Sequence, residues 1–337
     1  SISRLYSCQV YDNGTLIRDF KPCRNSSGVY GLFDEVNDVF YTTPSGSFTG
    51  NVAETSIKLS QSFRRRLLTS SIKVEVDYEK RYLTIESLGS GNIGLSGGTI
   101  YYSKNGGAWV SSTNGASVTV VSGDKVRFKA TRTTAEPKIK FSGTAKFNVY
   151  GNIMSLIHGD GFVGNNSLFS HVFDELFSAS LVVDASNLIL PATRVPEYGY
   201  YYMFLNCTSL TTAPELPATS VSVDAYTGMF YGCKNLIKAP SKLPATSTGS
   251  YCYAWMFQNC TSLKTAPSEI SAISLANYAC SNMFEGCTSL KTAPEILATE
   301  GSYSCFISMF RGCTSLITAP SKIYLKTMFD DACRDML

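Results

Sequence analysis

The feature that most constrains the fold of this chain is a Met-Phe dipeptide that returns at a nearly constant interval. The dipeptide begins at Met203, Met229, Met256, Met283, Met309 and Met328. The spacing of the first five copies varies by a single residue, and the sixth follows after a shorter interval. A fixed period of this kind is the sequence signature of stacked repeats, in which each unit buries its apolar side chains only against its neighbours.

The first five units share more than the dipeptide, because a Cys follows each Met at the fourth position and a Leu at the seventh. These offsets place the three side chains on one face of a helix or helical turn. A Gly or Asn before each Cys suits a left-handed helix end, and the Ala-Pro after each Leu blocks further helix. A short strand such as Glu295-Ile296 is expected next. The predicted repeat core consists of Met203, Cys207, Leu210, Met229, Cys233, Leu236, Met256, Cys260, Leu263, Met283, Cys287, Leu290, Met309, Cys313 and Leu316.

The full pattern Met-Phe-x-Gly/Asn-Cys-Thr-Ser-Leu-x-x-Ala-Pro-x-Leu-Pro-Ala-Thr resembles the BspA-type (Treponema pallidum-type) leucine-rich repeat. The resemblance covers roughly residues 165–337, although the family usually carries Ala-Phe in place of Met-Phe. It implies a leucine-rich-repeat α/β solenoid of about six or seven rungs over residues 160–337. Leu176-Phe177 is expected to form a degenerate first rung, and Met328-Phe329 a C-terminal cap. Members are typically surface or secreted proteins of gut and oral bacteria or their phages, so the resemblance implies adhesion or receptor binding.

Residues 1–55 alternate and turn like β-structure, with a hairpin signal at Asn13-Gly14. Residues 11–22, and Gly28-Val29-Tyr30-Gly31-Leu32-Phe33-Asp34 after them, resemble the closing strands of a concanavalin-like (laminin-G-like) jelly roll. Such strands normally end a much longer domain. The resemblance therefore implies an incomplete jelly-roll domain over residues 1–55.

Residues 70–152 carry short alternating segments separated by Gly, Asn and Asp turns, which predicts an immunoglobulin-like β-sandwich. One hairpin is expected from residues 99–102 and Trp109-Val110, and a second from residues 118–121 and 126–130. The predicted fold class is therefore mixed and multidomain. A β-rich N-terminal half, made of jelly-roll remnant and immunoglobulin-like β-sandwich, precedes the leucine-rich-repeat α/β solenoid.

Composition argues against several classes of function. The formal net charge of +3 is too small to predict nucleic-acid binding, and no stretch predicts insertion into a membrane. Only two histidines are present, no Cys-x-x-Cys occurs, and phosphate-loop, nucleophile-elbow and dinucleotide motifs are missing. His158 near Asp160 offers an acid/base pair, but a loop histidine is the simpler interpretation. The sequence therefore predicts no catalytic residue, no metal ligand and no cofactor, and the chain is not expected to be an enzyme.

The eleven cysteines are expected to be mostly free. Five of them share one position in successive rungs, and packed helices lie about 10 Å apart, whereas a disulfide needs Cα atoms within about 7 Å. A bridge inside one rung, such as Cys252 with Cys260, stays open as an exception. Cys8 and Cys23 pair if they lie on adjacent strands.

Tyrosine is the residue type that points to a binding surface, because several copies recur at similar offsets in successive rungs. Rings with a polar tip suit sugar rings and protein interfaces. Packing along the edge of the solenoid is the more common role of such a stripe, and a lysine column with Thr211, Ile237 and Ile317 more often forms a solvated strand face. The candidate ligand-binding residues are Tyr198, Tyr200, Tyr226, Tyr251, Tyr253, Tyr278, Lys264 and Lys291.

Taken together, these features predict a non-enzymatic extracellular or cell-surface binding protein. The expected partner is a glycan or protein on a host or bacterial surface, with no nucleic-acid partner. Two alternatives stay open. A phage tail receptor-binding protein would be part of a virion and form a homotrimer, and an accessory region of a larger glycan-degrading enzyme would accompany a catalytic domain.

Overall fold

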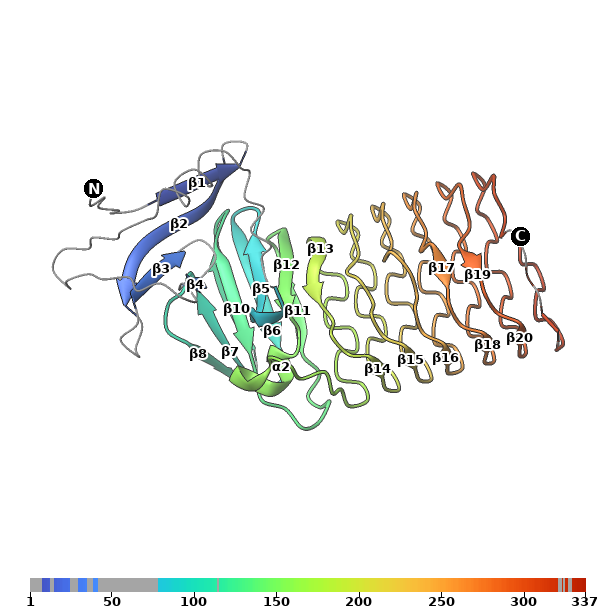
Figure 1. Cartoon of the computed structure of the whole chain (residues 1–337), viewed down its shortest axis with the longest axis horizontal. Coiled ribbons are helices and arrows are strands. Elements are labelled where there is room, and N and C mark those ends of the chain that lie inside the picture. Colours follow the sequence, from blue (N-terminus) through green and yellow to red (C-terminus); the bar gives the residue numbers. More distant parts are fainter. Residues whose placement is uncertain are drawn as a thin grey trace. The chain divides into compact units, whose positions relative to one another are not determined.

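The computed structural model describes residues 78–113, 115–320, 323, 325–326 and 329–337, together with the backbone of four strands within residues 8–41 (Figure 1). The chain divides into two compact units, Ser1–Asp77 and Tyr78–Leu337. The two units are described separately below.

The first unit contains one antiparallel sheet in which the strands follow chain order. Its strands are β1 (Cys8–Asp12), β2 (Thr15–Arg24), β3 (Tyr30–Asp34) and β4 (Val39–Tyr41). The predicted hairpin is confirmed, since Asp12 pairs with Thr15 across Asn13-Gly14. Cys8 lies opposite Phe20 and Cys23 opposite Gly31, so the register does not place the two cysteines opposite each other. The jelly-roll resemblance stays a prediction.

The second unit begins with two sheets that share a core. Phe128 in one sheet and Phe141 in the other make an edge-on ring contact at 4.9 Å. The order is β13-β12-β5-β10-β7-β8 in the larger sheet and β11-β6-β9 in the smaller. The first eight of these strands follow a 3-10 turn, η1 (Tyr78–Lys80), and are β5 (Leu83–Ser87), β6 (Gly91–Ser96), β7 (Thr99–Lys104), β8 (Val110–Thr113), β9 (Ala116–Val120), β10 (Lys125–Lys129), β11 (Lys140–Gly143) and β12 (Phe147–Asn152).

One of the two hairpins predicted in this region is confirmed and the other is wrong. β7 and β8 pair antiparallel, as expected. β9 pairs with β6 in the smaller sheet, whereas β10 lies between β5 and β7 in the larger one. The turn at residues 121–124 therefore carries the chain from one sheet to the other. The sequence does not distinguish a hairpin within one sheet from a connection between two sheets, because alternating residues place an apolar face inward in either case.

The larger sheet continues directly into the repeat region. After α2 (Ser155–His158) and η2 (Gly159–Gly161), strand β13 (Val182–Ile189) pairs parallel with β12 (Figure 1). The rings of Phe141 and Phe177 stack at 5.2 Å and join the two cores. We call residues 171–337 the repeat array and each of its repeating units a rung.

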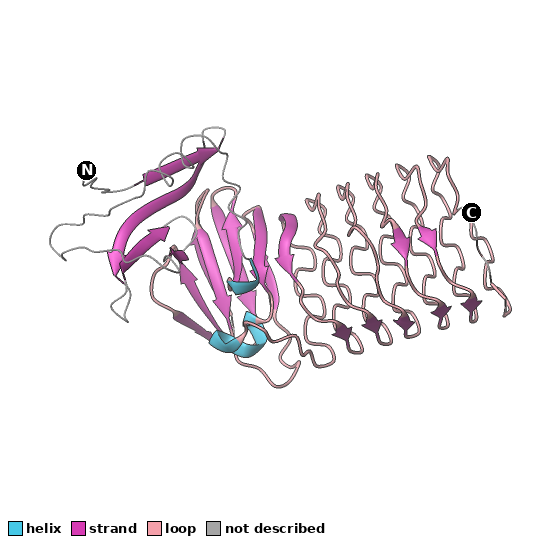
Figure 2. Cartoon of the chain, in the orientation of Figure 1, coloured by secondary structure: helices cyan, strands magenta, loops and turns pink. Residues whose placement is uncertain are grey.

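The predicted leucine-rich-repeat α/β solenoid is wrong, because the array is built from turns and very short strands (Figure 2). Among the described residues the only α-helix is α2, which precedes the array. Parallel pairs join β14 to β15, β15 to β16, β17 to β19 and β18 to β20. These strands are β14 (Arg194–Val195), β15 (Ser220–Val221), β16 (Ser247–Thr248), β17 (Glu269–Ile270), β18 (Ser274–Leu275), β19 (Glu295–Ile296) and β20 (Glu300–Gly301).

The segments that the sequence predicts to be helical have a left-handed residue at every fourth position. In one rung these are Tyr198, Tyr202 and Asn206, with φ of 55°, 47° and 54°. Backbone donors alternate between the same rung and the next: the Met203 N–H bonds to the Tyr200 carbonyl at 3.3 Å, and the Phe204 N–H to the Met229 carbonyl at 2.8 Å. A positive φ interrupts an α-helix. A turn of four residues still returns residues i and i+4 to one face, which is why the pattern resembled a helix.

The predicted core positions all face inward. Every one of the fifteen Met, Cys and Leu positions is buried except Leu316, which is partly buried. The Phe that follows each of the first five repeat Met residues forms a continuous column, which begins at Phe177 after Leu176. The rings of Phe177, Phe204, Phe230, Phe257, Phe284 and Phe310 stack in sequence at 5.3 to 5.5 Å. The expected rung separation of about 10 Å is therefore wrong, because extended and turn backbones approach more closely than helices do.

The cysteines of the second unit are nevertheless free, and the thiols in the column after the Phe hydrogen-bond to backbone. All nine cysteines of the second unit are unbridged, so the Cys252 to Cys260 alternative is wrong. The Cys260 thiol donates to the Phe230 carbonyl of the preceding rung at 3.1 Å, and four further thiols make the same bond at 2.9 to 3.1 Å. In the degenerate first rung Ser180 stands at the Cys position and contacts the Cys207 sulfur at 3.7 Å.

The last rung has a different register from the one that the sequence predicts. The Phe284 N–H bonds to the Met309 carbonyl, and in the following rung the Phe310 N–H bonds to the Met336 carbonyl. Met336-Leu337 therefore occupies the position of Met-Phe, at the regular interval of the repeat. Met328 lies outside the described residues.

Candidate functional site

The left-handed residues of successive rungs line one edge of the array. The first left-handed position holds His171, Tyr198, Asp224, Tyr251, Tyr278, Ser304 and Asp331, and the second holds Glu175, Tyr202, Gly228, Trp255, Asn282, Ser308 and Asp335. Neighbouring rings extend this edge. We define the aromatic edge as His171, Tyr198, Tyr201, Tyr202, Tyr231, Tyr251, Trp255 and Tyr278, all of which are half-buried.

Large rings are unfavourable at left-handed positions. The third left-handed position carries only Asn or Gly in the five regular rungs, which are the residue types that tolerate positive φ best. Tyr251, Trp255 and Tyr278 instead have φ of 55° to 58°, at a cost of about 1–2 kcal/mol per residue. Strained backbone is found preferentially where a side chain is needed for function. The aromatic edge is therefore the first candidate for a binding surface.

Ring contacts along this edge offset part of that cost. His171 and Tyr198 stack at 4.4 Å with an angle of 14°, and Tyr251 and Tyr278 stack at 4.8 Å with an angle of 3°. Tyr201 meets Tyr198 edge-on at 5.1 Å, with planes at 78°. These contacts hold the rings in fixed orientations at a half-buried surface.

The rings of Tyr200, Tyr226 and Tyr253 do not belong to the surface, and their prediction as ligand-binding residues is wrong. Each is at most 1% exposed. They stack inside the array behind Phe173, with successive centroids 5.8, 5.5 and 5.9 Å apart. They lie two residues after the first left-handed position, where the turn directs side chains inward. The other three candidate tyrosines, Tyr198, Tyr251 and Tyr278, do lie on the aromatic edge.

Lys264 and Lys291 lie on a different face, beside the parallel bridges. Both are exposed, and neither has an ion-pair partner among the described residues. The backbone N–H of Lys264 bonds to the Ile237 carbonyl at 3.0 Å, and the Ile317 N–H bonds to the Lys291 carbonyl at 2.9 Å. Exposed lysines on such a ladder are common in β-proteins and prevent edge association. This face carries no concentration of aromatic rings in the part of the chain that the structure describes.

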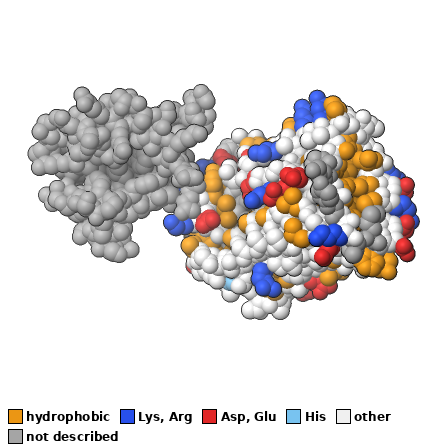
Figure 3. All heavy atoms as spheres, turned by 45° about the vertical axis from the view of Figure 1, so that its right-hand side comes forward, with side chains coloured by type: hydrophobic (Ala, Val, Ile, Leu, Met, Phe, Trp, Pro, Cys, Tyr) orange, Lys and Arg blue, Asp and Glu red, His pale blue; other side chains and the backbone are white. Residues whose placement is uncertain are grey.

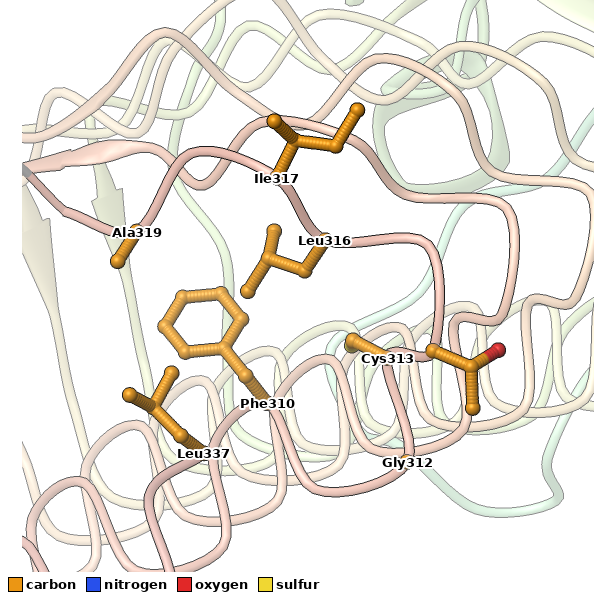
Figure 4. A pocket seen from close by; sticks show the side chains of 8 residues that line it. Phe310, Gly312, Cys313, Leu316, Ile317, Ala319 and Leu337 are labelled. Carbon is orange, nitrogen blue, oxygen red and sulfur yellow. The ribbon is translucent and has the colours of Figure 1, made fainter.

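A pocket of about 360 Å³ lies at the C-terminal end of the array. Leu316 points toward Phe310 inside it, and Leu337 closes one side (Figure 4). Figure 3 shows hydrophobic side chains gathered at the forward end of the array, where Ile317 is 81% and Leu337 75% exposed. The lining side chains are apolar except for Thr314.

The described residues offer little for catalysis. Among them, no three His, Cys, Asp or Glu side chains are grouped as a metal site would require. Asp160 accepts hydrogen bonds from Tyr82 at 2.6 Å and Lys129 at 2.8 Å, and no hydrogen bond joins it to His158. In the described part of the chain no helix has the length and apolar character needed to cross a membrane. Comparison with protein-family models, curated proteins and solved structures finds no match.

Sequence reasoning missed the residue that interrupts the aromatic edge. Asp224 stands at the first left-handed position between Tyr198 and Tyr251. Its carboxylate accepts a hydrogen bond from the Thr227 hydroxyl at 2.9 Å, and its negative charge raises the pKa of Tyr198. Aligning the rungs at their common period would have revealed it, because Asp224 and Gly228 replace rings at two positions of one rung.

Proposed function

We propose that this protein is a non-enzymatic binding protein whose aromatic edge recognises a glycan or protein on a cell surface. The observation that carries the proposal is the placement of Tyr and Trp at left-handed backbone positions. Asn or Gly would fold there at lower cost, as they do at the third position of the same rungs. A binding role explains why rings are kept.

The chemistry of the edge supports recognition of mixed polar and apolar ligands. Tyr and Trp present a broad apolar face and a polar tip, with few rotatable bonds to immobilise. They are the residue types that contribute most to binding in protein interfaces, and their faces also suit sugar rings. The repetition of this edge over successive rungs suits an extended ligand, which is typical of repeat architectures.

A location outside the cell, on the cell surface or in the extracellular space, belongs to the same proposal. An extended edge of rings is suited to a large, repetitive partner such as a polysaccharide or glycoprotein. The described structure gives less support to the lysine face or the C-terminal pocket as the binding site. The lysines lack neighbouring rings, and Thr314 carries the only hydroxyl among the side chains that line the pocket.

The test is binding of the fluorescently labelled protein to two surfaces: intact gut commensal cells and immobilised mucin. Tyr251→Ser with Tyr278→Ser should lose most binding to whichever surface is recognised. Ser304 and Ser308 occupy left-handed positions naturally, so serine suits this backbone. Lys264→Ser with Lys291→Ser is the matched control on the other face and should bind normally. Binding to neither surface, or equal loss in both variants, would overturn the proposal.

A further inference from the structure

The rung that contains Asp224 differs from both of its neighbours at the aromatic edge. Tyr198 precedes Asp224 by one rung and Tyr251 follows it by one rung at the same left-handed position. The buried rings of these rungs are 5.5 and 5.9 Å apart, so two rung steps separate Tyr198 from Tyr251. On the side away from Asp224, Tyr198 stacks on His171 and Tyr251 stacks on Tyr278. A carboxylate thus takes the place of one ring between two tyrosines.

Gly228, in the same rung, allows a third ring to approach. A Cβ atom added at Gly228 would overlap the Tyr202 ring, so any side chain here would displace that ring. Tyr202 also meets Tyr201 edge-on at 4.4 Å, with planes at 84°. Tyr201 is nearly perpendicular to Tyr198 as well, with planes at 78°. The Tyr201 ring thus stands at right angles to two neighbouring rings, so this part of the aromatic edge is not flat.

The Asp224 carboxylate lies within the electrostatic reach of four phenols. Its negative charge is the first cause of the raised pKa of Tyr198. Burial is the first cause of the raised pKa of Tyr201, Tyr202 and Tyr251, and the charge of Asp224 raises each of them further. Asp224 has no Lys, Arg or His partner in the described part of the chain. A ligand that covers this carboxylate must therefore compensate its charge.

We propose that Tyr198, Tyr201, Tyr202, Asp224 and Tyr251, here named the Asp224 cage, bind a substituted ammonium group. The trimethylammonium group of choline represents this ligand class. The inference rests on the proposed function, because it assigns a chemical group to one segment of the same aromatic edge.

The physical basis is the match between the cage and a weakly hydrated cation. A quaternary ammonium is attracted to the negative faces of aromatic rings and sheds its water easily. The carboxylate of Asp224 supplies the compensating charge that the rings alone do not provide. A neutral sugar hydroxyl would donate to the carboxylate but would leave its charge uncompensated. The cage therefore selects for charge as well as for shape.

The first experiment compares two ligands of equal shape with the whole protein. Choline chloride and its neutral analogue 3,3-dimethylbutan-1-ol are titrated separately, by calorimetry and by the fluorescence of Trp255. Trp255 stacks beside Tyr251 at 6.1 Å and so reports on the cage. Choline should bind saturably. The alcohol should bind with an affinity at least about tenfold lower. Equal binding of the two ligands, or no saturable binding of choline, would overturn the proposal.

The second experiment removes the charge without changing the shape. Asp224→Asn should weaken choline binding by about tenfold or more, because a charge-assisted contact is lost. Asn tolerates positive φ, so the rung should fold, and thermal unfolding checks this. Asp331→Asn is the matched control: Asp331 has φ of 59° at the same position of the last rung, but it pairs with Arg334. Unchanged binding in Asp224→Asn, or an equal loss in the control, would refute the assignment.

Competition separates this inference from the proposed function. Free choline should displace the protein from the cells or mucin that it recognises. Surface binding that survives saturating choline, with no choline binding by calorimetry, would overturn the cage and leave the proposed function standing. Vesicles of phosphatidylcholine distinguish the source of the group. Displacement by vesicles identifies a lipid headgroup, and displacement by free choline alone identifies a small or glycan-borne cation.

Discussion

The two-sheet region and the repeat array bury similar side chains but connect them differently. In the two-sheet region β5 lies between β10 and β12, so its neighbours in space come from distant parts of the sequence. In the array every rung contacts the rung before and the rung after it, at the fixed interval of the sequence repeat. A sheet core is therefore stabilised as a whole, whereas an array is stabilised between neighbouring rungs.

The largest expected effect comes from interrupting the ring column. Phe257→Ala removes a ring that stacks on Phe230 and Phe284 and should cost about 3–5 kcal/mol of unfolding free energy. Phe128→Ala in the two-sheet region should cost a similar amount. Denaturant unfolding gives the size, and hydrogen exchange should locate the Phe257 effect in adjacent rungs but spread that of Phe128 over both sheets. Uniform loss of protection in both variants would contradict the comparison.

Acid should affect the two-sheet region through Asp124. Hydrogen bonds from Lys104, Asn105 and the Val121 backbone lower the pKa of Asp124 from 3.8 to about 2. Because the folded pKa lies below the unfolded one, this stabilisation is present above pH 3.8 and is lost as the pH falls through about 2. Asp124→Asn should cost about 1–3 kcal/mol at pH 7 and abolish this part of the acid dependence. Unfolding free energies measured from pH 7 to 2 test both the loss at pH 7 and the loss of acid dependence. The same dependence of stability on pH in the variant as in the original protein would show that Asp124 is not its source.

A smaller effect is expected from the thiol column of the array. Cys260→Ala leaves the Phe230 carbonyl without its 3.1 Å thiol donor and should cost about 1–2 kcal/mol. Cys260→Ser should cost less, because a hydroxyl still donates and Ser180 already occupies the equivalent site. Chemical denaturation of both variants gives the order. A serine variant that is less stable than the alanine variant would show that the column works only through packing.

The smallest effect is expected at a buried hydroxyl. The Tyr226 ring lies inside the array, and its oxygen has no hydrogen-bond partner among the described residues. Tyr226→Phe should therefore be neutral or stabilising by up to about 1 kcal/mol. Phe173 occupies the same column without a hydroxyl and shows that phenylalanine fits. A loss above about 1 kcal/mol in thermal unfolding would indicate a partner for this hydroxyl.

The sequence predicts the core of the array better than its backbone. Met203 and Cys207 lie four positions apart, which suits an α-helix and also a coil of four-residue turns, and the two outcomes bury the same side chains. Hydrogen bonds between rungs determine which of the two backbones forms, and these bonds cannot be inferred from the sequence of a single rung. The Asn or Gly before each Cys did predict a left-handed residue correctly, although no helix ends there.

The candidate site was predicted only in part, for a related reason. Alternation and spacing show that Tyr198 and Tyr200 recur along the array, but they do not show which of the two faces inward. The direction depends on the left-handed turn at Tyr198, which places Tyr200 in the core. Asp224 was not predicted as a site residue, because it interrupts the recurrence of aromatic residues on which that prediction was based.

The most direct test of the account replaces an edge ring with a residue that suits the backbone better. Tyr251→Asn relieves the left-handed strain and removes the ring, so unfolding free energy and surface binding are measured on the same sample. We expect stability within about 1 kcal/mol of the original, since relief of strain offsets the lost stacking. Binding to the recognised surface should be weakened clearly, though less than in the double variant at Tyr251 and Tyr278. A variant that is clearly destabilised, by about 2 kcal/mol or more, yet binds as strongly as the original protein would show that the edge rings serve the fold and not recognition.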